Sequence, residues 1–131
     1  MNVAVIGNLQ YQGFGGGNVV QSIAAQATYT ALQSGVVDIP SGTAAGSVFP
    51  LPMGGVATGK GYMVKANSSV MLGVNGGTGT AQMQGIATGG YVFALGPLPG
   101  KQQAVVSLVV VVPAGNNVGN DGSVEYLVFG D

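Results

Sequence analysis

The chain has no histidine, cysteine, arginine or tryptophan, and only 5% of its 131 residues are charged. Without histidine and cysteine it cannot build the usual zinc site, nor a Ser–His or Cys–His nucleophilic pair. Three scattered lysines form no basic patch, so the chain lacks the means to neutralise phosphates. These absences argue against metal sites, the common forms of nucleophilic catalysis and nucleic-acid binding.

The scarcity of charge also bears on how the protein behaves in solution. Soluble domains carry about 25% charged residues, whereas the formal net charge here is −1. Copies of such a chain repel one another very little. We therefore expect much of the surface to be covered by other protein.

Few side chains are available for general acid–base chemistry. The candidates are four carboxylates, which lie at strand ends, in a turn and at the last residue. The arginine and tryptophan that accompany carboxylates in many sugar sites are missing. The segment from Gly54 to Lys60 matches most of a phosphate-binding loop, but Gly61 replaces its final Ser or Thr. We expect no enzymatic activity, no cofactor and no metal. The four carboxylates considered are Asp38, Asp121, Glu125 and Asp131.

From residue 35 onward, short apolar or alternating runs are separated by clusters of Gly, Pro, Asn, Ser and Thr. This pattern indicates strands, and after residue 60 they recur at a spacing of roughly 10–12 residues, which is typical of sandwiches and barrels. Asn75-Gly76 between two runs indicates a hairpin. The sequence therefore predicts an all-β, antiparallel β-sandwich that is jelly-roll-like, with about eight strands and an extended N-terminal arm. The expected strands cover residues 36–39, 47–51, 61–66, 70–74, 81–87, 91–95, 105–112 and 123–129.

The segment from Val19 to Gln33 leaves two alternatives open. Its alanines permit a helix, but Val, Thr and Tyr weaken helix propensity. The alternation of Ala27, Tyr29 and Ala31 suits a strand at least as well. We favour strand, with helix as the alternative.

The N-terminal residues differ from the rest of the chain. Residues 1–22 are interpreted as an arm, in which an apolar extended piece precedes a glycine-rich joint from Gly13 to Asn18. Residues 23–131 then form the sandwich domain. Because the arm is apolar, we expect it to attach to a partner surface, by adding a strand either to another protein or to a neighbouring copy. The attachment residues predicted are Val3, Val5, Ile6 and Leu9.

The most apolar stretch is AVVSLVVVVP, from Ala104 to Pro113. It is far shorter than the roughly 20 residues of a membrane-spanning helix, and valine favours strand. A strand that is apolar on both faces can pack one face on the core, while the other has to meet a further surface, such as another copy. The predicted subunit-interface residues are Val105, Val106, Leu108, Val109, Val110, Val111 and Val112.

Four stretches carry a resemblance to known proteins: Val37 to Pro52, Val70 to Met83, Gly89 to Pro97 and Val124 to Asp131. With their glycine-rich turns, sparse charge and valine-rich strands, they resemble small β-sandwich structural proteins of tailed-bacteriophage virions. The resemblance spans residues 35–131. It includes no catalytic or binding motif, so no functional residue is carried over from it.

This resemblance implies a non-enzymatic virion protein of the capsid decoration, cement or head-fibre type. We expect a decoration or cement protein that binds and stabilises the phage head shell, commonly as a homotrimer. Its partners would be further copies and the major capsid protein, without nucleic acid or membrane, in a virion assembled in the host cytoplasm. The arm would then attach to the capsid. The alternative is a head-fibre or tail-tip module whose loops, such as Asn116 to Gly122, contact a host receptor or glycan.

Overall fold

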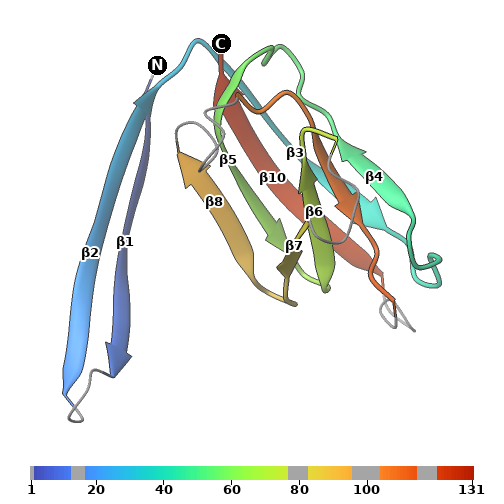
Figure 1. Cartoon of the computed structure of the whole chain (residues 1–131), viewed down its shortest axis with the longest axis horizontal. Coiled ribbons are helices and arrows are strands. Elements are labelled where there is room, and N and C mark those ends of the chain that lie inside the picture. The colour runs from blue at the N-terminus through green and yellow to red at the C-terminus, as the bar shows by residue number, and fades with distance from the viewer. Residues whose placement is uncertain (1, 13–16, 77–82, 96–103, 115–120) are drawn as a thin grey trace.

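The regular structure of the described residues consists of strands. The computed structural model describes residues 2–12, 17–76, 83–95, 104–114 and 121–131, and within these ranges it contains ten strands and no helix that could cross a membrane (Figure 1). The strands are β1 (Asn2–Gln12), β2 (Asn18–Thr28), β3 (Ala31–Ile39), β4 (Val48–Leu51), β5 (Gly59–Ala66), β6 (Val70–Val74), β7 (Met83–Ile86), β8 (Tyr91–Leu95), β9 (Leu108–Val111) and β10 (Gly122–Gly130).

Eight of these strands form two antiparallel four-stranded sheets, in the orders β3-β10-β5-β8 and β4-β9-β6-β7. If the eight strands are lettered B to I in chain order, the sheets read B-I-D-G and C-H-E-F, which is the topology of a jelly roll. The expectation of an all-β, jelly-roll-like sandwich of about eight strands is confirmed. The segment that could have been helix or strand belongs to β2 and β3.

Alternation along the strands builds the core between the two sheets. In β10, Val124, Tyr126 and Val128 are buried and face inward. The Tyr126 hydroxyl donates a hydrogen bond to the Pro52 carbonyl oxygen over 2.8 Å, so the buried phenol keeps a polar partner. Each fully buried Val or Leu side chain stabilises such a core by roughly 1.5–3 kcal/mol. The other inward side chains include Ile39, Leu51, Val64, Val70, Leu72, Ile86, Leu108 and Val110.

The turn after β6 follows the sequence prediction. Asn75 and Gly76 both have positive φ, 55° and 77°, and β6 pairs antiparallel with β7. The Asn75 side chain also holds a distant segment. Its Nδ2 donates to the Ala104 carbonyl oxygen over 2.8 Å, and its Oδ1 accepts from the Val106 backbone N–H over 2.7 Å.

The valine-rich run is shorter as a strand than predicted. The sequence predicts a strand over residues 105–112, whereas β9 covers only Leu108–Val111. Val105 instead forms a separate antiparallel bridge with Gly59 at the start of β5, in the other sheet. The run therefore crosses from one sheet to the other. At the crossing it is held by the hydrogen bonds of the Asn75 side chain to Ala104 and Val106.

The two remaining strands form a long hairpin outside the sandwich. β1 and β2 pair antiparallel from Asn2 with Thr28 to Gln12 with Asn18, without a register shift. Figure 1 shows this hairpin standing apart from the sandwich on the side of β8. β2 runs through residue 22, the predicted end of the arm, and continues to Thr28. The glycine-rich run therefore does not join an arm to the sandwich. It falls between the end of β1 and the start of β2, the two strands that pair in the hairpin.

Candidate functional site

One outer surface of the sandwich is apolar at every strand position. Antiparallel partners share a face, so the register defines two rows across the β4-β9-β6-β7 sheet. One row is Val48, Val111, Met71 and Gly85, and the other is Pro50, Val109, Gly73 and Met83. We call these eight residues the apolar face. A solvent-facing sheet surface usually carries polar side chains, so the surface is suited to burial against protein.

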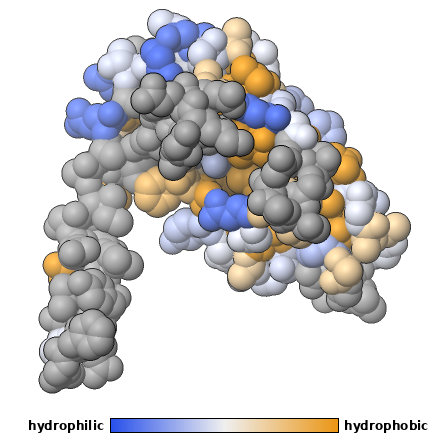
Figure 2. All heavy atoms as spheres, viewed as in Figure 1, coloured by the Kyte–Doolittle hydropathy of each residue, from blue (hydrophilic) through white to orange (hydrophobic). Residues whose placement is uncertain are grey.

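The apolar face is hollowed at one end. A cavity of about 430 Å³ lies over the row that contains Val48, Val111 and Met71, and its other lining residues are also apolar. Val48 is 49% exposed, whereas Val111, which lies between Val48 and Met71, is 8% exposed. Figure 2 shows hydrophobic residues gathered where β6 and β9 lie. The remaining residues that line the cavity are Ala45, Gly46, Met83, Val112, Pro113 and Ala114.

The structure divides the seven predicted interface residues among three places. Val105, Leu108, Val110 and Val112 are buried in the core of the single chain. Val109 and Val111 lie on the apolar face, and Val106 is 61% exposed beside the crossing. Only these three remain for contact with another copy, and that contact stays a prediction.

The predicted attachment residues lie together in β1, but not on one face. Pairing places Val3 opposite Ala27, Val5 opposite Ala25 and Leu9 opposite Gln21, all in one set of alternate positions. Ile6 pairs with Ala24 in the other set and is 82% exposed. The register therefore separates Ile6 from the other three.

The opposite sheet has an outer surface that the sequence analysis did not single out. We call it the mixed face: Leu32, Ser34, Val36, Met63, Lys65, Tyr91, Phe93, Glu125 and Leu127, as the register of β3, β10, β5 and β8 places them. Tyr91 is 65% exposed and Val36 is 61% exposed. The sequence did contain a signal for this surface. In the alternating strands β3 and β10, apolar residues stand at outward positions as well as at inward ones.

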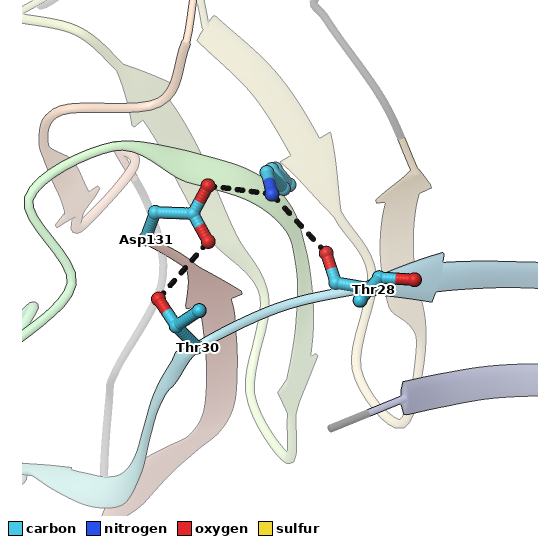
Figure 3. Close-up of polar contacts among 4 residues, drawn as sticks. Thr28, Thr30 and Asp131 are labelled. Carbon is cyan, nitrogen blue, oxygen red and sulfur yellow. Dashed lines mark hydrogen bonds and ion pairs between the residues drawn. The ribbon is translucent and has the colours of Figure 1, made fainter.

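A polar cluster fixes the root of the hairpin to the sandwich. Figure 3 shows Thr28, Thr30 and Asp131 converging there. The Lys60 ammonium forms an ion pair with Asp131 and donates a hydrogen bond to the Thr28 carbonyl oxygen over 3.3 Å. The Thr30 hydroxyl donates to Asp131 over 3.0 Å, and the Thr30 N–H donates to the Gly130 carbonyl oxygen over 2.9 Å. The root is thus held through both backbone and side chains.

Apolar contact supports the same root. The Tyr29 ring lies 5.7 Å from the Phe129 ring, centroid to centroid, at a tilt of 54°. Phe129 points to the outer side of β10, yet it is only 2% exposed. Room for its ring comes from Gly61 on the neighbouring strand, where a Cβ atom would overlap the ring.

The Asp131 contacts predict a pH dependence. Hydrogen bonds from Lys60 and then Thr30 lower the pKa of Asp131 from its ordinary value of 3.8. Asp131 therefore binds a proton less readily in the folded chain than in the unfolded chain. The stabilisation that its contacts give is fully present above pH 3.8 and is lost as the pH falls through the lowered pKa. Because the carboxylate is exposed, the effect is small.

Thermal melts from about pH 6 to about pH 2 test this dependence. Asp131→Asn should be slightly less stable than the natural chain near pH 6, and the gap should close at the acid end. Asp38→Asn, on a strand away from the root, is the control and should show no such gap. A gap for Asp131→Asn that persists unchanged to pH 2 would contradict the role given to its carboxylate.

The predicted chemical motifs are placed as follows. The segment from Gly54 to Lys60 leads directly into β5 rather than into a helix. Asp121 accepts a hydrogen bond from the Ser41 N–H over 2.9 Å, and Tyr62 faces the core, where burial raises its pKa. Among the described residues no group of three or more acidic, histidine or cysteine side chains comes together. Most of the loop from Asn116 to Gly122 lies outside the described residues.

Comparison with known proteins adds no relative. No family, no curated protein and no solved structure matches the chain significantly. What can be said of its function therefore depends on the surfaces described above.

Proposed function

We propose that the chain is a non-enzymatic structural protein of a virion, a capsid decoration or cement protein that binds and stabilises a phage head shell as a homotrimer. The observation that carries the proposal is the apolar face. Its eight positions hold no polar side chain, although it is the outer surface of a sheet whose inner surface already packs on the core. A sheet that is apolar on both sides is expected to pack on further protein.

The two outer surfaces give the protein two different contacts. Subunits pack through the apolar face, where Val109 and Val111 lie. The mixed face contacts the major capsid protein, because it combines exposed apolar side chains such as Met63, Phe93 and Tyr91 with the charges of Lys65 and Glu125. A homotrimer presents three mixed faces together, so that weak individual contacts add up to firm binding.

The fold and the composition are compatible with this role. Jelly rolls occur in viral capsid and lectin domains, although a fold alone does not determine a function. The net charge of −1 gives little repulsion between neighbouring copies on a shell. Contacts made mainly by apolar surface also depend little on salt.

Binding to purified empty head shells tests the proposal. The natural chain should sediment with the shells and raise the temperature at which they fall apart. Met63→Asp, which puts a charge on the mixed face, should bind the shells more weakly and keep the solution mass of the natural chain. Thr88→Asp, in the exposed turn before β8, is the control and should bind normally.

Two outcomes would overturn the proposal. If the protein leaves shell stability unchanged and does not sediment with shells, the decoration role is wrong. If it binds host cells without the shell, the receptor or glycan module takes its place.

A further inference from the structure

The β1–β2 hairpin has an amphipathic pattern. In one set of alternate positions, Val3, Val5, Gly7, Leu9 and Tyr11 pair with Ala27, Ala25, Ile23, Gln21 and Val19. The other set contains most of the Asn, Gln, Ser and Thr residues, from Asn2 opposite Thr28 to Gln12 opposite Asn18. We call the first set the apolar side of the hairpin. It holds one polar residue among ten, which is the pattern of a sheet with one buried face.

A two-stranded sheet of this kind needs a surface to cover it. An isolated hairpin is at best marginally stable in water, and its stability rises when its apolar side packs on other structure. In the described part of the chain, the hairpin meets the sandwich chiefly where β2 passes β8. No charged residue lies between residues 2 and 28, so neither charge nor proline protects its long edges.

The hairpin cannot cover the apolar face of its own copy. Its root is fixed at the outer side of the β3-β10-β5-β8 sheet, by the contact of Tyr29 with Phe129 and by the hydrogen bonds of Thr30 with Gly130 and Asp131. The apolar face belongs to the other sheet and points away on the far side of the sandwich. Each copy therefore carries an apolar hairpin and an apolar receiving surface that it cannot join by itself.

We propose that the apolar side of the hairpin packs on the apolar face of a second copy of the chain. Both surfaces are uncharged, since the described charged residues lie on the outer side of the β3-β10-β5-β8 sheet, at the hairpin root or in a loop. The cavity beside Val48, Met71 and Val111 can receive side chains from the hairpin. The sequence allowed the arm either the capsid or a neighbouring copy, and this inference assigns it to the copy.

The inference rests on the proposed function and deepens it by naming the element that joins the subunits. A hairpin that packs on a different surface of the next copy makes a head-to-tail contact. Such contacts close into a ring when the rotation between copies allows it, and three copies would form the expected homotrimer. The mixed faces stay free for the shell.

Cysteine cross-linking between copies tests this contact, because the natural chain has no cysteine. A chain with Val5→Cys is mixed with an equal amount of a size-tagged chain that carries Val48→Cys, Met71→Cys or Met83→Cys, and the mixture is mildly oxidised. We expect a mixed disulfide dimer with at least one of the three receiving positions. The matched control is Ile6→Cys, the next residue along, which the register places on the other side of the hairpin. Its yield should be at least about tenfold lower, since cysteines whose Cβ atoms point apart cannot form a disulfide without movement of the backbone.

The outcomes separate this inference from the proposed function. If light scattering shows an assembly but Val5→Cys gives no mixed dimer with any receiving position, or no more than Ile6→Cys, the hairpin contact is wrong. The shell-binding experiment decides the decoration role independently. If Val5→Cys cross-links only to itself, hairpins pair with hairpins and the inference is again overturned. A natural chain that stays monomeric overturns it as well.

A second pair of variants gives a readout without oxidation. Val5→Gln should reduce the solution mass to that of one chain, because it puts an amide into the hairpin contact. Ile6→Gln should keep the mass of the natural chain. Equal masses for the two variants would contradict the assignment of the apolar side.

Discussion

Replacing Val109 with aspartate is expected to reduce the solution mass of the protein to that of a single chain and to leave the sandwich folded. Val109 lies on the apolar face between Pro50 and Gly73, and it is half-buried in one copy. In a free chain the new carboxylate can reach water. In the assembly it would be buried without a partner, which costs several kcal/mol.

The control for this substitution is the same change on the other sheet. Val36→Asp places a carboxylate on the mixed face, where Val36 is 61% exposed, and it should not alter the mass. Light scattering coupled to size exclusion measures both variants, and circular dichroism checks that they keep their β structure. If Val109→Asp stays assembled, the apolar face does not join subunits. If it unfolds, Val109 serves the core rather than the surface.

Replacing Phe129 with alanine is expected to lower the free energy of unfolding by about 3–5 kcal/mol, the usual loss for a fully buried phenylalanine. The ring packs against the Gly61 backbone and the Tyr29 ring and is 2% exposed. Its removal leaves a cavity beneath the hairpin root. The melting temperature should fall by about 10 °C or more for a domain of this size.

Phe93→Ala is the matched control for Phe129→Ala. Both rings lie on the outer side of the same sheet, but Phe93 is 43% exposed and has less contact to lose. Its effect on the free energy of unfolding should be below about 1 kcal/mol, as for most exposed positions. Denaturant titrations of both variants at low protein concentration measure the difference. Similar losses for the two would contradict the account of the hairpin root.

The strands of the sandwich were predictable because each depends on a local pattern. Alternation in β10 and the turn at Asn75-Gly76 carry their information within a few residues. The same holds for the two-sided character of the valine-rich run. Val109 and Val111 point outward and Leu108 and Val110 point inward, so a strand that is apolar on both sides could be recognised without the fold.

The remaining features depend on contacts between distant segments. Val105 leaves the strand because Gly59, 46 positions earlier, pairs with it, and Asn75 holds its neighbours. Phe129 is buried on an outer face because of Gly61 and Tyr29. Pairing of β1 with β2 changes the arm into a hairpin and separates Ile6 from Val3, Val5 and Leu9. No local sequence pattern predicts these contacts, because they form only when distant strands pair in register.

The solution mass of the purified natural chain decides whether another copy covers the apolar face. Light scattering coupled to size exclusion, at low and at high salt, should give three times the mass of one chain under both conditions, because contacts between uncharged surfaces depend little on ionic strength. A soluble, well-behaved monomer at both salt concentrations would contradict the account.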